Sequence, residues 1–247
     1  ITRHGHTALI TINRPDTRNA LSGDEMFAAF ESLVDELNGD LSVRAAVLTG
    51  AGTAFCSGGN VAEMRDRTGM FAGSPEEITE RYRQGIQRIP RALARLQVPL
   101  IAAVNGPAIG AGFDLANMAD IRIASTKAKF GETFLNLGII PGDGGAWFMQ
   151  RLIGYQQAFE LTLSGRIVGA EEAKTLGIVL DVVDPDQLLA RTHDMAARFA
   201  AQPPKALRLT KRLLEHAGYA VATRAYPSAR LYSGLQDGSV HIWPGAP

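Results

Sequence analysis

The chain has 247 residues, 46% of them hydrophobic and 20% charged, so it can bury the core of one sizeable domain and is not of the disordered type. Its 25 basic and 25 acidic residues balance, which excludes an overall field that would attract nucleic acid or an anionic membrane. The single cysteine, Cys56, excludes an internal disulfide and a clustered-cysteine zinc site. No apolar run approaches the roughly 20 residues that span a bilayer, and the opening segment alternates like a strand rather than a signal peptide. We therefore expect a cytoplasmic protein without nucleic-acid or membrane partners.

Strand and helix patterns alternate along the first 190 residues. Short apolar runs predict strands within 7–15, 44–50, 98–106, the end of 112–125, and 179–184. Helical spacing predicts helices over 22–40 with a Ser22 cap, 75–97 with an interruption at Pro90, the start of 112–125, 146–165 as one or two helices, and 169–178. Strands that end in glycine and alternate with helices are typical of an α/β protein with mostly parallel strand pairing.

The chain beyond about residue 185 has a different pattern. PDQLLARTHDMAARFAAQ and PKALRLTKRLLEHA are amphipathic helical sequences with no strand between them. They predict an appended helical region, and we divide the chain into a core at 1–190 and this region at 191–247. The last segment, YSGLQDGSVHIWPGAP (232–247), has no helical period, and its structure stays open.

Three glycine-bearing loops each follow a predicted strand. They are GAGTAFCSGGN (50–60), NGPAIGAGFD (105–114) and GIIPGDGGAW (138–147). Glycine after a buried strand often lets the backbone itself approach a ligand. Parallel sheets bind ligands beyond the carboxyl ends of their strands, where such loops gather. The loops therefore predict a site, although a plain turn is the alternative for each loop taken alone.

Several common kinds of site are excluded by missing residues. GAGTAF has Phe55 in place of the third glycine of a dinucleotide-binding loop, and no Gly-Lys-Ser/Thr sequence forms a Walker A loop. The five histidines are scattered without metal-ligand spacing. CSGG does not supply the G-x-S-x-G elbow of a Ser-His-Asp hydrolase. What remains is chemistry carried by the backbone of the loops.

Backbone amides of two loops can form an oxyanion hole. Gly110-Ala111-Gly112 opens a predicted helix, whose first N–H groups are free and lie at the positive end of the helix dipole. A second free N–H, from SGGN (57–60), can converge on the same point. Two such donors suit a thioester carbonyl whose oxygen gains charge in an enolate-like transition state.

Five ordered stretches carry a family resemblance that runs from about residue 13 to residue 214. They are NRPDTRNALS, VLTGAGTAFCSGGNVAEM, VPLIAAVNGPAIGAGFDLANMADIRIAS, FGETFLNLGIIPGDGGA and LSGRIVGAEEAKTLGIVLDVV. Together they resemble the crotonase superfamily, the enoyl-CoA hydratase/isomerase group. The resemblance implies a lyase or isomerase built as a crotonase-like spiral of ββα units, with a C-terminal helical region that forms trimers or hexamers. It implies a coenzyme A thioester substrate, no metal, and no cofactor beyond the coenzyme A of the substrate.

The resemblance also implies roles for individual residues. The Gly59 and Ala111 N–H groups would form the oxyanion hole. Arg18 would lie near the CoA phosphates, since a guanidinium can bind a phosphate with two hydrogen bonds; a solvated surface charge is the alternative. The other residues expected at the substrate are Ala20, Ser57, Gly58, Asn60, Val61, Ala62, Phe134, Pro141 and Gly142.

The carboxylates depart from those of a simple hydratase. Hydratases of this family hold water with two glutamates, whereas this sequence has Asp114 at the first position and Phe134 at the second. A phenyl ring can neither donate nor accept the proton. Glu132 lies two residues earlier and would share the face of Phe134 in a strand but not in every bend. Whether Glu132 takes the role of the missing glutamate therefore stays open.

Asp143 lies in the loop IIPGDGGAW. Pro-Gly-Asp-Gly is strong turn chemistry, so a surface turn is one interpretation. The resemblance supplies another, because relatives that are not simple hydratases carry a working carboxylate in this loop. A carboxylate at the edge of an apolar pocket near Phe134, Ile139 and Trp147 would have its pKa raised towards that of a useful base. We therefore predict that Asp143 and Asp114 are the catalytic carboxylates, with Asp143 as the base.

The leading functional hypothesis is an acyl-CoA enzyme that stabilises a thioester enolate. Isomerisation of an enoyl-CoA double bond is slightly favoured over hydration, because one carboxylate beside an oxyanion hole suffices for it. Hydrolysis or carbon–carbon cleavage of a cyclic or aromatic-derived acyl-CoA is the second hypothesis. A non-catalytic CoA-ester binder or an RNA-binding relative is the third, and segment 75–97 argues against RNA because its arginines alternate with glutamates.

Overall fold

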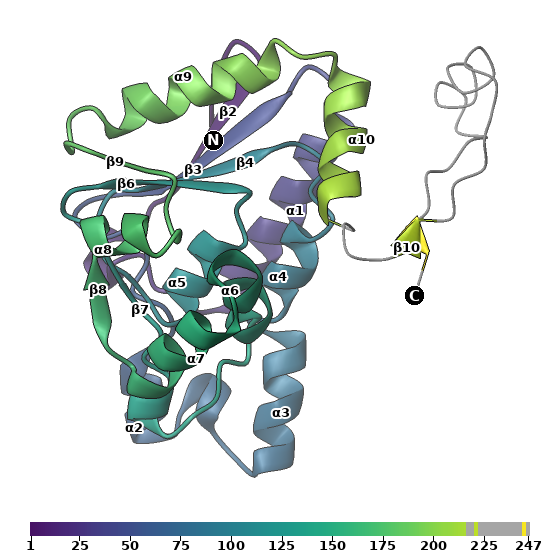
Figure 1. The fold of residues 1–247 in the computed structure, drawn as a ribbon. Coiled ribbons are helices and arrows are strands. Elements are labelled where there is room, and N and C mark those ends of the chain that lie inside the picture. The colour runs from purple at the N-terminus through teal and green to yellow at the C-terminus, as the bar shows by residue number, and fades with distance from the viewer. Residues whose placement is uncertain (216–219, 222–243, 246–247) are drawn as a thin grey trace.

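The computed structural model describes residues 1–215, 220–221 and 244–245 (Figure 1). The segment 232–247, for which the sequence predicts no helical period, therefore lies almost wholly outside the described residues. Among the residues that are described, every helix is too short or too polar to cross a bilayer.

A six-stranded sheet forms the centre of the protein. Its strands, in spatial order, are β1 (Thr2–His4), β2 (Thr7–Ile12), β3 (Ala45–Gly50), β4 (Leu100–Val104), β6 (Ile121–Ser125) and β9 (Asp181–Val183). Only the β1–β2 hairpin is antiparallel, and the other neighbours pair in parallel. A smaller sheet joins β5 (Ala108–Ile109), β7 (Lys129–Gly131) and β8 (Ile167–Gly169). The short strands β10 (Ala220–Val221) and β11 (Pro244–Gly245) pair with each other.

Helices connect the strands in the order expected of an α/β protein. The α-helices are α1 (Asp24–Gly39), α2 (Val61–Asp66), α3 (Pro75–Gln84), α4 (Arg88–Leu93), α5 (Ala111–Asn117), α6 (Gly145–Ile153), α7 (Tyr155–Ser164), α8 (Ala170–Thr175), α9 (Leu188–Ala200) and α10 (Pro204–Glu215). Single 3-10 turns are η1 (Pro15–Thr17), η2 (Gly69–Phe71) and η3 (Leu135–Leu137). The mostly parallel α/β architecture predicted from the sequence is confirmed.

Both faces of the large sheet are covered. Successive residues of a strand point to opposite faces, and in β3 Val47 packs with Met195 of α9 while Leu48 packs in the larger core with α1, α4 and α5. Figure 1 shows α9 across one side of the sheet and α1, α4 and α5 on the other. Coverage of both faces explains why β3 and β4 are buried along their whole length rather than alternating.

Two predicted helix details are wrong. The cap of α1 is Gly23, with φ of 87°, and no side chain caps this helix. The segment 75–97 does not break at Pro90; α3 ends at Gln84, before Gly85, and α4 begins at Arg88. Proline is tolerated in the first turn of a helix, where its missing N–H has no helical partner to lose, so Pro90 sits inside α4.

The two C-terminal helices that the sequence predicted are present and pack on the core. The guanidinium of Arg208 on α10 donates to the carbonyl oxygens of Leu37 and Asn38 at the end of α1. Lys211 donates to the carbonyl oxygen of Val98 at 3.0 Å. These buried cations satisfy carbonyl groups that a helix end and a strand start leave without donors.

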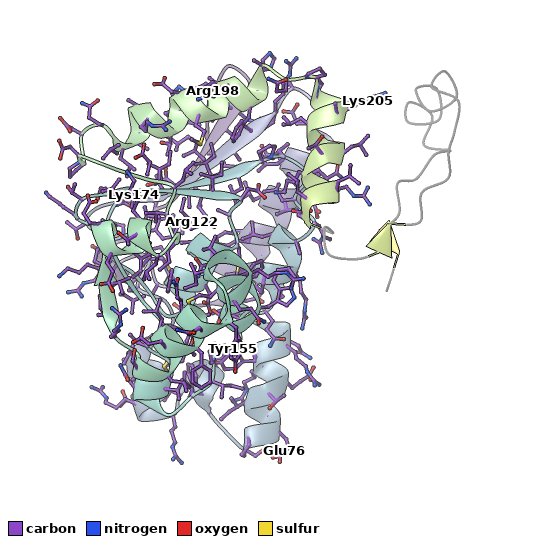
Figure 2. All side chains as sticks on the ribbon, in the orientation of Figure 1. Glu76, Arg122, Tyr155, Lys174, Arg198 and Lys205 are labelled. Atoms are coloured by element: carbon purple, nitrogen blue, oxygen red, sulfur yellow. The ribbon has the colours of Figure 1, made fainter. Side chains whose placement is uncertain are left out.

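A buried arginine fixes the end of α5. Arg122 on β6 is buried, and its guanidinium donates to the carbonyl oxygens of Ala119, at 2.6 Å, and Ile178, at 2.7 Å. Burial lowers the pKa of Arg122 to about 10, and the nearby Asp120 opposes that shift. The residue joins α5 to the turn before β9, and Figure 2 shows it within the body of the protein.

We expect Arg122→Met to lower the free energy of unfolding by about 3 kcal/mol, because at least two buried carbonyl groups lose their donor. Urea denaturation would measure this change. Arg198→Met, at an exposed position on α9 (Figure 2), is the matched control and should change stability by less than about 0.5 kcal/mol. Equal effects of the two substitutions would contradict this role of Arg122.

Candidate active site

The loop after β3 and the start of α5 approach each other closely. Gly58 has φ of 84°, and a Cβ placed on it would lie 2.5 Å from the carbonyl oxygen of Ile109 and 3.2 Å from the amide nitrogen of Ala111. A Cβ on Gly112 would lie 2.1 Å from the carbonyl oxygen of Cys56. Only glycine allows this contact, so the glycines that the sequence marked as loop residues bring the two loops together.

Two amides at this contact are free to bind a ligand. Within the described residues, the N–H groups of Gly59 and Ala111 donate to no protein acceptor, whereas Phe113 and Asp114, further along α5, both donate to the carbonyl oxygen of Gly110. Ala111 is the first residue of α5, where helix geometry leaves the N–H free and the helix dipole is positive. Two such free donors are what an oxyanion hole requires, and their role in one stays a prediction.

A third segment, residues 17–21, is tied to the same loop. Ser57 donates its amide to the carbonyl oxygen of Arg18 at 3.0 Å, and Leu21 donates to Gly58 at 2.8 Å. The buried side chain of Asn19 accepts from Arg14 and donates to the carbonyl oxygens of Ala51 and Ala54, each at 2.9 Å. Sequence reasoning missed Asn19; its φ of 60°, which asparagine tolerates, is the reason that the residue type fits.

Three carboxyl groups meet beside α5. Asp114 lies in the first turn of α5, Glu132 directly follows β7, and Asp143 precedes α6. All three are buried, and both oxygens of Asp114 and Glu132 and one of Asp143 are inaccessible and receive no hydrogen bond from an amide, a hydroxyl or a cation. A Cβ on Gly145 would lie 2.0 Å from Oδ1 of Asp114 and 2.5 Å from Oε1 of Glu132.

Burial governs the protonation of this carboxyl cluster, by which we mean Asp114, Glu132 and Asp143. It raises all three pKa values, and it raises the pKa of Glu132 to about 8. The charges of Asp143 and Glu132 raise the pKa of Asp114 further, whereas a hydrogen bond from Asp114 and a backbone N–H oppose the rise in the pKa of Asp143. Asp114 therefore holds its proton most strongly, and Asp143 ionises most easily.

The Asp143 side of the cluster is lined by neutral groups. Burial and the charge of Asp143 raise the pKa of Cys56 and of Tyr82 to about 12 each, so both stay protonated at neutral pH. Gln87 donates to the carbonyl oxygen of Gly142 at 2.8 Å, which fixes the loop that carries Asp143. A Cβ on Gly142 would lie 2.9 Å from the Tyr82 ring, so the backbone must be bare here too.

The two predicted aromatic neighbours of Asp143 lie in different places. Phe134 is buried in the core, with its ring near Gly110. Trp147 is 47% exposed, beneath the guanidinium of Arg151 at 3.8 Å. Trp147 is the third residue of α6 and is partly open to solvent, so its place beside the substrate stays a prediction.

The remaining predicted substrate residues lie around the two loops. Ala20 is buried and Arg18 is exposed in the left-handed conformation, with φ of 53°. Asn60 caps α2, where its side chain accepts from the amides of Ala62 and Glu63. Val61 and Ala62 are exposed on the first turn of α2, and Pro141 is half-buried ahead of Asp143. In the described chain, no group of three or more metal-ligating side chains is arranged to hold a metal ion.

Known proteins with this sequence pattern and fold share one family. The enoyl-CoA hydratase/isomerase family model matches residues 2–232. A probable enoyl-CoA hydratase of Mycobacterium leprae is 40% identical over 209 residues, covering 84% of this chain and 70% of its own. The 1,2-epoxyphenylacetyl-CoA isomerase of Escherichia coli is 36% identical over 208 residues, covering 84% and 78%. The crystal structure of an enoyl-CoA hydratase from Bacillus anthracis superposes with a TM-score of 0.81 at 31% identity, over 97% of this chain and 86% of that one.

The chain belongs to the enoyl-CoA hydratase/isomerase family. The resemblance to the crotonase superfamily and the predicted crotonase-like fold are confirmed, and so is the expectation of an enzyme of the lyase or isomerase class. The family does not separate hydration from isomerisation, since its members here include both hydratases and an isomerase.

Gly145 tests the close packing of the cluster. We expect Gly145→Ala to lower the free energy of unfolding by about 1–3 kcal/mol, because the added methyl group overlaps oxygens of Asp114 and Glu132. Gly39→Ala, at a helical position with open space around it, should leave stability unchanged or raise it by up to about 1 kcal/mol. Thermal unfolding of both variants measures the difference, and an unaltered Gly145→Ala protein would refute the packing.

Proposed function

We propose that this protein moves a double bond within an enoyl-CoA thioester, with Asp143 as the base and Asp114 as the acid. The amides of Gly59 and Ala111 hold the thioester oxygen. The observation that carries the proposal is the buried carboxyl cluster, in which Asp114 faces the charges of both neighbours while a backbone N–H stabilises the ionised form of Asp143. A proton acceptor and a proton donor at one site are what an allylic proton transfer requires.

The reaction needs one balanced set of transfers. Asp143 removes a proton from the carbon next to the thioester carbonyl, and the electron pair moves to the carbonyl oxygen, which the two amides stabilise. The enolate then collapses, and the proton of Asp114 goes to the far carbon of the allylic system. The proton on Asp143 passes back to Asp114 within the carboxyl cluster, so the enzyme is restored and the substrate keeps its composition.

Phe134 supports isomerisation over hydration. Hydration requires an ordered water held by acid and base groups on both sides, and Phe134 places an apolar ring in the core beside Gly110, where a second carboxylate would be needed. The relative that isomerises 1,2-epoxyphenylacetyl-CoA provides independent support for isomerase chemistry. Hydration is the second candidate, favoured by the relatives named as hydratases and by the second acid that Glu132 brings to the site.

The loop after β3 and the segment 17–21 offer a continuous surface for the coenzyme A moiety. We propose that it lies along Ser57–Ala62 and residues 18–20, with the exposed Arg18 near its phosphates and Pro141–Gly142 near the thioester. The hydrogen bonds that join residues 17–21 to the Gly58 loop support this placement, because they make one continuous surface of the two segments.

We also propose that the protein assembles as a homotrimer or hexamer through the region 191–247 together with α7. Tyr155, Phe159 and Leu163 lie four residues apart on α7 and expose 69%, 50% and 50% of their surface, a stripe that a neighbouring subunit would bury (Figure 2 labels Tyr155). Sedimentation equilibrium should give three or six times the chain mass of 26.4 kDa. A concentration-independent monomer would contradict this proposal.

Asp143→Asn is the direct test of the base. We expect turnover of the best enoyl-CoA substrate to fall by ~10²-fold or more while binding of the CoA ester is retained, because the amide keeps the shape of the side chain and cannot accept the proton. Asp186→Asn, at an exposed site, is the control and should keep full activity. Turnover of Asp143→Asn at the control rate would show that another group is the base.

The reaction type is read from the products. Incubation with a panel of enoyl-, dienoyl- and cyclic acyl-CoA thioesters, followed by absorbance and mass measurement, separates three outcomes: no change in mass for isomerisation, addition of water for hydration, and free CoA for hydrolysis. The proposal predicts a product of unchanged mass. Exclusive addition of water would replace it with hydration.

A further inference from the structure

We propose that Glu132 is a positioning residue for proton transfer: it shares a proton with Asp114 and so holds Asp114 in the protonated form that donates to the enolate. The donor role of Asp114 rests on the proposed function. The shared proton itself does not, and it has its own test below.

The contact is built into the backbone. Glu132 leaves β7 immediately beside β5, which leads into α5, so the smaller sheet brings Glu132 to the first turn of that helix. A Cβ placed on Gly145 would lie 2.0 Å from Oδ1 of Asp114 and 2.5 Å from Oε1 of Glu132. The two oxygens therefore lie close together on one side of α6.

These two carboxyl groups have no other way to satisfy their oxygens. Both oxygens of each are inaccessible and receive no hydrogen bond from an amide, hydroxyl or cation. Two ionised carboxylates in such a place would repel each other without any compensating charge. A proton between them supplies the missing donor, because a protonated carboxyl group can donate to its neighbour.

The groups that act on Glu132 electrostatically are the other members of the cluster. Burial and the charge of Asp143 raise the pKa of Glu132 to about 8, and the hydrogen bond with Asp114 opposes this rise. Cys56, after β3, and Tyr82, on α3, face the Asp143 side, and both remain neutral because their pKa values lie near 12. The pKa values of the cluster are therefore set by its own members, and no lysine, arginine or histidine of the described chain contributes to them.

Glu132 acts on the acid rather than on the base. Both its charge and its hydrogen bond raise the pKa of Asp114, whereas the shift in the pKa of Asp143 comes from burial, from Asp114 and from a backbone amide. Removing the carboxyl group of Glu132 should therefore free the proton of Asp114 and leave the ionisation of Asp143 as it was.

The pH profile of kcat/KM tests this asymmetry. We expect Glu132→Gln to move the alkaline limb to lower pH by at least one unit, a tenfold change, because Asp114 loses its proton more readily. The acidic limb should stay in place. Glu132→Asp keeps a carboxyl group and should restore most of the alkaline limb. Glu171→Gln, at an exposed position on α8, is the matched control and should show the wild-type profile.

A purely structural role for Glu132 predicts a different profile. It would lower kcat/KM by the same factor at every pH and leave both limbs in place, and that result would overturn the proposal. Movement of the acidic limb in place of the alkaline limb would overturn it too, because it would make Asp143 the partner of Glu132.

A second experiment tests the shared proton without depending on turnover. Infrared difference spectra should show the C=O stretch of protonated carboxyl groups at pH 7 in the wild type and a smaller band in Glu132→Gln. If no acyl-CoA is turned over but this band behaves as expected, the proposed function fails and the shared proton stands. If isomerisation is found but the wild type shows no protonated carboxyl band, the shared proton and the role of Asp114 as the acid both fail, and the isomerase activity stands.

Stability provides a third readout in the same variants. Between the unfolded-chain pKa of a glutamate, about 4.3, and the folded value of about 8, the native protein binds more protons than the unfolded chain. The contribution of this site to the free energy of unfolding therefore falls as pH rises. Glu132→Gln should make the drop in thermal midpoint from pH 5 to pH 8 smaller than in the wild type, and an equal drop would count against the proposal.

Discussion

The site depends on one constraint, which is that three carboxyl groups lie buried together and that, in the described part of the chain, no cation pairs with them. Asp114, Glu132 and Asp143 come from α5, from the end of β7 and from the loop before α6, so the constraint joins the smaller sheet and two helices. A charge in such surroundings is costly, and burial accordingly raises all three pKa values. The cost is reduced when protons are shared, and a set of carboxyl groups that shares protons can both accept one and donate one.

The close approach of backbone segments makes this arrangement possible. Gly58 and Gly112 let the loop after β3 contact the start of α5, where the amides of Gly59 and Ala111 have no protein acceptor in the described part of the chain. Gly145 lets α6 approach the oxygens of Asp114 and Glu132. At the far end of α5, Arg122 holds the last carbonyl groups, so the helix that carries both an amide donor and a carboxyl group is fixed at its two ends.

Much of the fold and the outline of the site were predictable from the sequence, and the failures have physical causes. Apolar runs that end in glycine located β3 and β4 because these strands are covered on both faces. The break between α3 and α4 was misplaced at Pro90, because a proline in the first turn of a helix breaks nothing. Residue spacing could not decide the place of Glu132, since the chain bends after β7.

The central claim is a particular distribution of protons, in which Asp143 is ionised and Asp114 is protonated at neutral pH. Neutron diffraction from crystals of the unmodified protein, exchanged into heavy water near pH 7, would locate these protons directly. The account predicts a deuteron on Asp114 within the cluster and none on Asp143. A deuteron on Asp143 with Asp114 bare would contradict the assignment of base and acid.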